Sequence, residues 1–199
     1  MGKLLIATGN PGKTREIQSL LDDLSVEIVT PAQIGLSFVI VEDGETYSAN
    51  AALKARAFAE ATGMIVLADD SGLEVDALGG LPGIHSARYS PVPESTDIAR
   101  REHLLYNLQG IPRPWTALFR CVIALAEPSG KIHFTEGICP GEIIPEERGH
   151  NGFGYDPIFL IPRLGKTMAE LSIDEKNSIS HRARAVIAAR PTLIEIFNR

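Results

Sequence analysis

Short apolar runs alternate with amphipathic segments along the chain. An apolar run over residues 3–7 ends in the turn-forming residues 8–12, which predicts a buried strand that enters a turn. A helix should follow directly, because Asn10 is a good N-cap, Pro11 suits the first helical position, and apolar residues then recur at helical spacing. The chain therefore begins with a strand, a glycine-containing turn and a helix.

The same patterns continue through the first half of the chain. Residues 46–62 are rich in alanine and predict a second helix, which Gly63 ends. Short apolar runs predict further strands over residues 26–29, 38–41 and 64–68. The last of these strands should end at a turn formed by Asp69-Asp70-Ser71-Gly72.

The second half adds a hairpin to the pattern. Apolar residues alternate over residues 116–126, and with residues 131–138 this predicts two strands joined by a turn at Gly130. Helices are expected over 96–108 and 180–197, with a kink at Pro191, and a short strand over 158–161. A hairpin among mixed strands and helices predicts an α/β fold whose sheet has both parallel and antiparallel pairs.

Length and composition are those of a globular protein. The chain has 199 residues, of which 44% are hydrophobic and 22% charged, so we expect one compact domain over residues 1–199. The net charge of −6 and the lack of a Lys/Arg-rich run argue against a nucleic-acid polymer as partner. No apolar run reaches the roughly 18 residues of a membrane span, and no signal peptide is recognisable, so we expect a cytoplasmic protein.

Two cysteines, Cys121 and Cys139, are too few for a disulfide framework or a metal cluster. They could lie opposite one another on the hairpin strands. In a reducing compartment we expect two buried thiols.

The segment Thr8-Gly9-Asn10-Pro11-Gly12-Lys13 is the first candidate site. A helix start offers unpaired backbone N–H groups and the positive end of the helix dipole, and Lys13 adds a full charge. Polyphosphate is the ligand that this combination predicts. The alternative is a capped helix with a lysine that faces solvent.

Carboxylates form the second candidate site. Asp69 and Asp70 end one predicted strand and Glu42 ends another, and Mg²⁺ commonly binds one or two carboxylates together with substrate phosphates. Neighbouring side chains on a strand point to opposite faces, so Asp69 and Asp70 should have different roles. The alternative is an exposed structural turn.

Two further groups could contact a nucleotide. Phe153 and Tyr155, in the segment Gly152 to Asp156, offer rings that could stack on a base or pack in the core. Lys176, His181 and Arg182 supply hydrogen-bond donors suited to phosphate or to a base carbonyl, although a solvated helix start would look similar.

Taken together, these segments resemble the inosine triphosphate pyrophosphatase family, also described as non-canonical purine nucleoside-triphosphate pyrophosphatases. The resemblance covers nearly the whole chain in order. It rests on Thr8 to Lys13, Asn50-Ala51 with Lys54-Ala55, Ala68 to Leu73, Leu78 to Gly83 with Ser86 to Tyr89, Gly152 to Pro157, and Ser180-His181-Arg182.

This resemblance implies both a fold and an activity. The fold is α/β and two-lobed, a long mixed sheet flanked by helices with the active-site cleft between the lobes, and the assembly is a homodimer. The activity is hydrolysis of dITP, ITP and XTP to the nucleoside monophosphate and pyrophosphate, which cleanses the nucleotide pool, with Mg²⁺ as cofactor.

Site residues carry over by position from the family. Asp70 looks like the general base, and Glu42 and Asp70 look like metal ligands. Thr8, Gly9, Asn10, Pro11, Gly12 and Lys13 look like the triphosphate site. The other substrate contacts that the resemblance implies are Lys54, Ser71, Phe153, Gly154, Tyr155, Asp156, Lys176, His181 and Arg182. Donors from His181 or Arg182 would favour a 6-oxo purine over adenine.

The chain departs from the family at two places. Ala49 stands where many relatives carry a glutamate, and Glu45 or Asp43 could compensate for it. Pro191 interrupts a C-terminal helix that is usually continuous in the family.

Two other functions compete with this interpretation. A P-loop NTPase would need glycine five residues before Gly12, where this chain has Ala7. A non-catalytic nucleotide sensor would be expected to lose the carboxylates, which this chain keeps.

Overall fold

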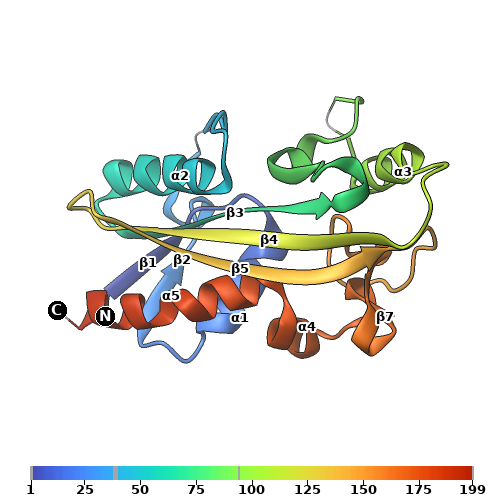
Figure 1. The fold of residues 1–199 in the computed structure, drawn as a ribbon. Helices are drawn as coiled ribbons and strands as arrows, with labels where there is room; N and C mark the ends of the chain where they lie inside the picture. Colours follow the sequence, from blue (N-terminus) through green and yellow to red (C-terminus); the bar gives the residue numbers. More distant parts are fainter. Residues whose placement is uncertain (1, 38–39, 94, 199) are drawn as a thin grey trace. The chain divides into compact units, whose positions relative to one another are not determined.

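A computed structural model describes residues 2–37, 40–93 and 95–198 (Figure 1). The helices of the described residues are α1 (Pro11–Leu21), α2 (Tyr47–Thr62), α3 (Asp97–Asn107), α4 (Ile173–Ile179) and α5 (His181–Phe197). The strands are β1 (Gly2–Ile6), β2 (Val26–Val29), β3 (Ile65–Val75), β4 (Trp115–Ala126), β5 (Ile132–Ile143), β6 (Phe159–Ile161) and β7 (Lys166–Thr167).

The described strands form one seven-stranded sheet in the order β2-β1-β3-β4-β5-β6-β7. Strand β1 pairs in parallel with β2 and with β3, where Leu4 lies opposite Ile65. Strand β6 pairs antiparallel with β5 and β7. The prediction of a mixed α/β sheet flanked by helices is therefore confirmed.

The chain divides into two compact units. One contains Met1–Asp70, Cys121–Gly137 and His181–Arg199, and the other contains Ser71–Arg120 and Ile138–Ser180. Strands β3, β4 and β5 contribute residues to both units. The single domain over 1–199 and the cleft between lobes stay predictions.

In the first unit, helices cover both faces of the strands, with α2 on one side and α1 and α5 on the other (Figure 1). The alternation of side chains along each strand explains the two layers, because successive residues point to opposite faces. Leu4 and Ile6 of β1 pack with α1 and α5, whereas Leu5 packs with α2. The resulting apolar layers hold the ends of β1 and β3 in place.

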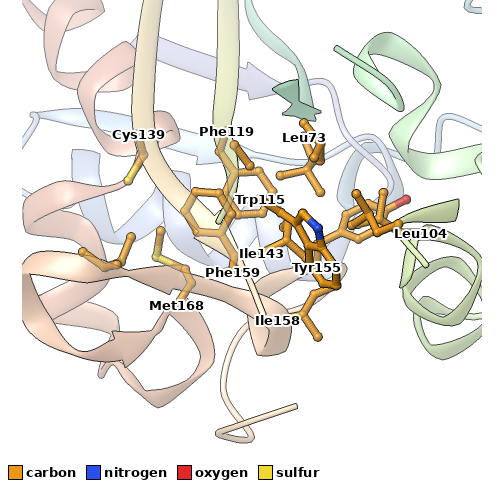
Figure 2. Close-up of a cluster of buried hydrophobic side chains, with 14 of the residues drawn as sticks. Leu73, Leu104, Trp115, Phe119, Cys139, Ile143, Tyr155, Ile158, Phe159 and Met168 are labelled. Atoms are coloured by element: carbon orange, nitrogen blue, oxygen red, sulfur yellow. The ribbon is translucent and has the colours of Figure 1, made fainter. Parts of the chain in front are cut away.

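The second unit has an aromatic core of its own (Figure 2). Phe119 of β4 and Phe159 of β6 lie with ring centroids 4.3 Å apart. Trp115, Tyr155 and Leu104 of α3 belong to the same cluster. These contacts anchor α3 and the segment around Tyr155 to the sheet.

Local signals placed several elements correctly. Asn10 caps α1 and Pro11 is its first residue, while Thr46 and Gly63 cap the two ends of α2. The helices expected over 96–108 and 180–197 correspond to α3 and α5. Pro191 lies inside α5, and its kink stays a prediction.

Strand lengths and two segments differ from the expectation. Strand β3 runs to Val75 rather than residue 68, and β5 runs to Ile143 rather than residue 138, because pairing with neighbouring strands extends both. Residues 156–158 form a 3₁₀ turn, so β6 is shorter than predicted, and α4 was not expected at all. Of the strand expected over 38–41, residues 38 and 39 lie outside the described residues, and Ile40 and Val41 are not in a strand.

Two expectations from composition can be compared with the structure. Among residues 2–37, 40–93 and 95–198, none of the helices combines the length and apolar character that a membrane crossing requires. Cys121 and Cys139 are both buried thiols, as expected.

Candidate active site

The loop before α1 is closed by its own side chains. The Oδ1 atom of Asn10 accepts hydrogen bonds from the backbone N–H groups of Gly12, at 2.8 Å, and Lys13, at 3.2 Å. The N–H of Thr14 donates to the Asn10 carbonyl. The prediction of unpaired N–H groups at this helix start is therefore wrong, because the N-cap satisfies them.

The loop still offers positive charge and space to a phosphate. A Cβ atom built on Gly9 would meet no other atom within 4 Å, so the chain leaves room beside this residue. The positive end of the α1 dipole and the ammonium group of Lys13 lie at the same end of the helix. The N–H groups of Gly12 and Lys13 could bind phosphate only if the Asn10 side chain moved.

Lys13 does not simply face solvent. Its Nζ atom lies 2.9 Å from Oδ2 of Asp69, whose side chain is fully buried. Asp69 also pairs with Arg182 of α5, and Arg182 forms a second buried ion pair with Glu16 of α1. Four charges of alternating sign thus link the loop, strand β3 and the start of α5.

The expected turn at Asp69 to Gly72 is wrong, because these residues lie within β3. The physical reason is that the neighbouring strands and ionic partners satisfy this segment in an extended conformation. The expectation that the two carboxylates differ holds: Asp69 pairs with Lys13 and Arg182, whereas Asp70 faces residues of α2. The strand geometry separates the two acids.

Asp70 sits in a pocket of polar groups from α2. Nδ2 of Asn50 donates to Oδ2 of Asp70 at 3.2 Å, and Nζ of Lys54 lies 3.8 Å from Oδ1. The same Lys54 ammonium lies 3.1 Å from Oε1 of Glu42. Asn50 also accepts a bond from the N–H of Gly44, so one buried amide connects the Glu42 segment to Asp70.

The two aspartates differ in acidity. Burial raises the pKa of Asp70 above its ordinary value, and the charges of Lys54 and Lys13 oppose this only in part. Burial also acts on Asp69, but the positive charges of Lys13, Arg182 and Lys54 outweigh it and hold the pKa of Asp69 well below its ordinary value. Asp70 is therefore the better proton acceptor of the two.

The start of α5 carries the other two predicted donors of this unit. His181 and Arg182 are both buried. The helix approaches β5 so closely at Gly137 that an added Cβ atom would lie 2.1 Å from the carbonyl oxygen of His181. Thr135 of β5 donates to the carbonyl of Ala185 at 2.8 Å, which fixes the first turn of the helix.

The remaining predicted contacts lie in the second unit. Nζ of Lys176 lies 2.6 Å from Oδ2 of Asp156 and 5.1 Å from the centroid of the Phe153 ring. Lys176 is buried, so the solvated helix start is wrong for it. Tyr155 packs in the aromatic core, and its hydroxyl donates to the carbonyl of Ser86 at 3.0 Å, so its ring cannot stack on a ligand.

The structure groups the predicted residues into two sets. Lys13, Lys54, Glu42, Asp70 and Arg182 belong to the first unit with the loop Thr8 to Lys13 and His181. Phe153 to Asp156 and Lys176 belong to the second, as does Ser71, the β3 residue after Asp70. Lys176 thus belongs to a different unit from His181 and Arg182.

Two residues of the first set, Glu16 and Asn50, received no site role from the sequence. Glu16 stands three residues after Lys13, so both lie on one face of α1, and this spacing is the signal that could have identified it. Asn50 is a weak helix former inside the alanine-rich α2, which could have marked a side chain with another task. Asp43 and Glu45 are exposed, and their compensation for Ala49 stays a prediction.

Known proteins resemble this chain over its full length. Residues 4–192 match the model of the Ham1 family. A dITP/XTP pyrophosphatase of Desulforamulus reducens is 48% identical over 198 residues, 99% of this chain and 96% of the relative. A dITP/XTP pyrophosphatase of Bacillus subtilis is 46% identical over 187 residues, 94% of each chain. The structure of a HAM1 protein from Coxiella burnetii is similar with a TM-score of 0.88 at 40% identity, and the match covers 98% of this chain and 100% of that chain.

The geometry defines a class of protein in which a mixed α/β sheet carries two neighbouring buried carboxylates, each beside a lysine. The comparisons make the assignment specific: the chain belongs to the Ham1 family, which confirms the family resemblance seen in its sequence.

Proposed function

We propose that this chain hydrolyses dITP, ITP and XTP to the nucleoside monophosphate and pyrophosphate, and so cleanses the nucleotide pool. Relatives at 46% and 48% identity that bear the name dITP/XTP pyrophosphatase support this activity. The observation that carries the proposal is the pair of strand carboxylates, in which Asp69 is neutralised by Lys13 and Arg182 while Asp70 keeps a raised pKa beside Lys54.

Asp70 is the general base of the proposed reaction. A carboxylate whose pKa is raised toward the operating pH accepts a proton from water better than one held strongly acidic. Asn50 fixes one oxygen of Asp70 by its hydrogen bond, which leaves the carboxylate a defined orientation. Asp69 has a different role, since it holds Lys13 and Arg182 in place.

Lys13 and Lys54 bind the triphosphate. Both ammonium groups are largely shielded from solvent, with side-chain exposures of 17% and 12%, so their charge acts over short distances without full screening. Gly9 leaves space for the phosphate oxygens. The lysines thus oppose the negative charge that the triphosphate carries as the anhydride bond breaks.

Glu42 and Asp70 would hold Mg²⁺. Among the described residues, no group of three or more His, Cys, Asp or Glu side chains could hold a metal ion by itself. Glu42 and Asp70 nevertheless share one cation, the Lys54 ammonium, and Mg²⁺ usually combines one or two carboxylates with substrate phosphates. The donor set therefore fits an ion that arrives with the nucleotide, and when bound it would neutralise phosphate charge.

The base is recognised by donors and by a ring. An N–H group of His181 or Arg182 would pair with a 6-oxo purine, and the 6-amino group of adenine would leave that donor without a partner. Glu16 and Asp69 hold Arg182 in one orientation. Phe153 offers the ring on which the purine would stack. A homodimer in the cytoplasm completes the proposal; the homodimer rests on the family resemblance, and the location rests on the sequence pattern.

Replacing the base tests this assignment. Asp70→Asn should lower the rate of pyrophosphate release from dITP by at least about a hundredfold, because a general base contributes that much or more. Inosine triphosphate binding without Mg²⁺, measured by calorimetry, and the melting temperature should change little. Activity should disappear with EDTA and return with Mg²⁺, and Glu42→Gln should raise the Mg²⁺ concentration required.

Asp76→Asn is the matched control. Asp76 directly follows β3, belongs to the second unit and accepts a bond from Thr116. This variant should keep wild-type turnover. Near-normal activity of Asp70→Asn would contradict the role given to Asp70.

A further inference from the structure

The segment Phe153 to Asp156 is held in one shape from within. Oδ2 of Asp156 accepts from the N–H of Phe153 at 2.9 Å and from Nζ of Lys176 at 2.6 Å. Gly152 has a φ of 74°, and a Cβ atom there would lie 2.0 Å from the same Asp156 oxygen. The turn therefore needs glycine at this position, and its carboxylate links the Phe153 backbone to Lys176.

Helix α3 holds the same segment from outside. The N–H of Gly154 donates to Oδ2 of Asp97 at 2.7 Å, and the carbonyl of Gly154 accepts from Nη1 of Arg101 at 2.8 Å. The first group belongs to the peptide that follows Phe153, and the second to the next peptide. Both peptide planes beside Gly154 are thereby fixed.

Arg101 is itself fixed. Its Nε and Nη2 atoms form two parallel bonds to Glu147 at 2.7 and 2.8 Å, and only 7% of the residue is exposed. A planar guanidinium can make this two-fold contact and still donate to a carbonyl, whereas a lysine ammonium cannot reproduce the geometry. Arg101 and Asp97 thus connect α3 to the backbone at Gly154, next to Phe153.

We propose that Arg101 and Asp97 are positioning residues for the purine base. By fixing both peptides at Gly154, they hold the Phe153 ring as a rigid platform next to Lys176. This inference rests on the proposed function, because it assigns the platform to the base of the nucleotide. It adds three residues, Asp97, Arg101 and Glu147, that no sequence motif of the chain marks.

Arg101→Lys is the direct test, and Arg190→Lys is its matched control. Arg190 makes the same set of contacts in the first unit: two nitrogens bond to Asp23 at 2.7 and 2.5 Å, and one also donates to the carbonyl of Leu20 at 2.7 Å. Both substitutions break a two-fold contact with a carboxylate and a bond to a carbonyl, and only Arg101→Lys touches the platform.

Kinetics with and without the base separate positioning from general damage. For Arg101→Lys we expect the KM for dITP to rise about tenfold, while kcat stays within about twofold of the wild type. A tenfold loss of affinity corresponds to part of the binding energy of one stacked base. Inhibition by inorganic tripolyphosphate, which lacks a base, should stay unchanged. Arg190→Lys should resemble the wild type in both assays. Equal losses for dITP and tripolyphosphate, or an unchanged KM, would overturn the proposal.

Amide hydrogen exchange provides a readout that needs no turnover. Peptides that cover residues 152–156 should exchange faster in Arg101→Lys than in the wild type, and Arg190→Lys should leave them unchanged. If the wild type released no pyrophosphate from dITP, the proposed function would fail. The exchange result alone would then test whether Arg101 fixes the backbone at Gly154. Unchanged amide exchange in Arg101→Lys would refute this role of Arg101.

Discussion

The buried ion network at Asp69 allows a quantitative prediction for Glu16→Gln. Glu16 and Arg182 are 4% and 2% exposed, and Arg182 has Asp69 as its second acidic partner. The substitution keeps the size of the side chain and removes one negative charge. Asp69 then remains as the acidic partner of both Arg182 and Lys13.

The magnitude follows from this partial loss of compensation. Breaking a buried ion pair by removing one partner costs about 3–5 kcal/mol, because the remaining charge stays buried. Since Asp69 remains beside Arg182, we expect the lower end, about 3 kcal/mol. For a chain of this size one kcal/mol corresponds to about 2–4 °C, so the melting temperature should fall by about 6–12 °C.

Thermal unfolding followed by circular dichroism at pH 7 measures this shift. The control is Asp23→Asn, which removes the carboxylate partner of Arg190 at the protein surface. An exposed pair contributes little, so this variant should melt within about 2 °C of the wild type. A Glu16→Gln variant that melted as close to the wild type as this would refute the idea that the network stabilises the unit.

Two further predictions concern close packing and a buried thiol. Gly137→Ala places a Cβ atom 2.1 Å from the His181 carbonyl, so it should lower the free energy of unfolding by about 1–3 kcal/mol. A Cβ atom at Gly9 meets no neighbour, so Gly9→Ala should leave the melting temperature unchanged. Equal melting temperatures for the two variants would contradict the close contact at Gly137. Burial raises the pKa of Cys121 to about 12, so the thiol stays protonated at pH 8. Iodoacetamide should therefore label Cys121 only after unfolding, which mass spectrometry would measure. Rapid labelling of the folded protein would contradict the burial of this thiol.

What the sequence predicted well depends on neighbours in the chain. Asn10, Pro11 and Thr46 mark helix starts through contacts within three or four residues, so the beginnings of α1 and α2 were readable directly. The separate roles of Asp69 and Asp70 followed from strand alternation in the same way.

The features that the sequence did not predict depend on partners that are distant in the chain. The Asp-Asp-Ser-Gly sequence is typical of a turn, yet strand pairing and charged partners keep it extended in β3. Arg182 meets Asp69 and Glu16 across 113 and 166 residues of sequence, and no periodicity encodes such pairs. The hydrogen bond from Arg101 to the Gly154 carbonyl likewise joins residues that are distant in the sequence.

The identity of the products tests the central claim most directly. Phosphorus NMR of the protein incubated with dITP and Mg²⁺ distinguishes pyrophosphate from orthophosphate in one spectrum. We predict pyrophosphate and deoxyinosine monophosphate in equal amounts. Orthophosphate with the nucleoside diphosphate would indicate a P-loop type of hydrolysis, binding without any product would indicate a sensor, and either result would contradict the proposed function.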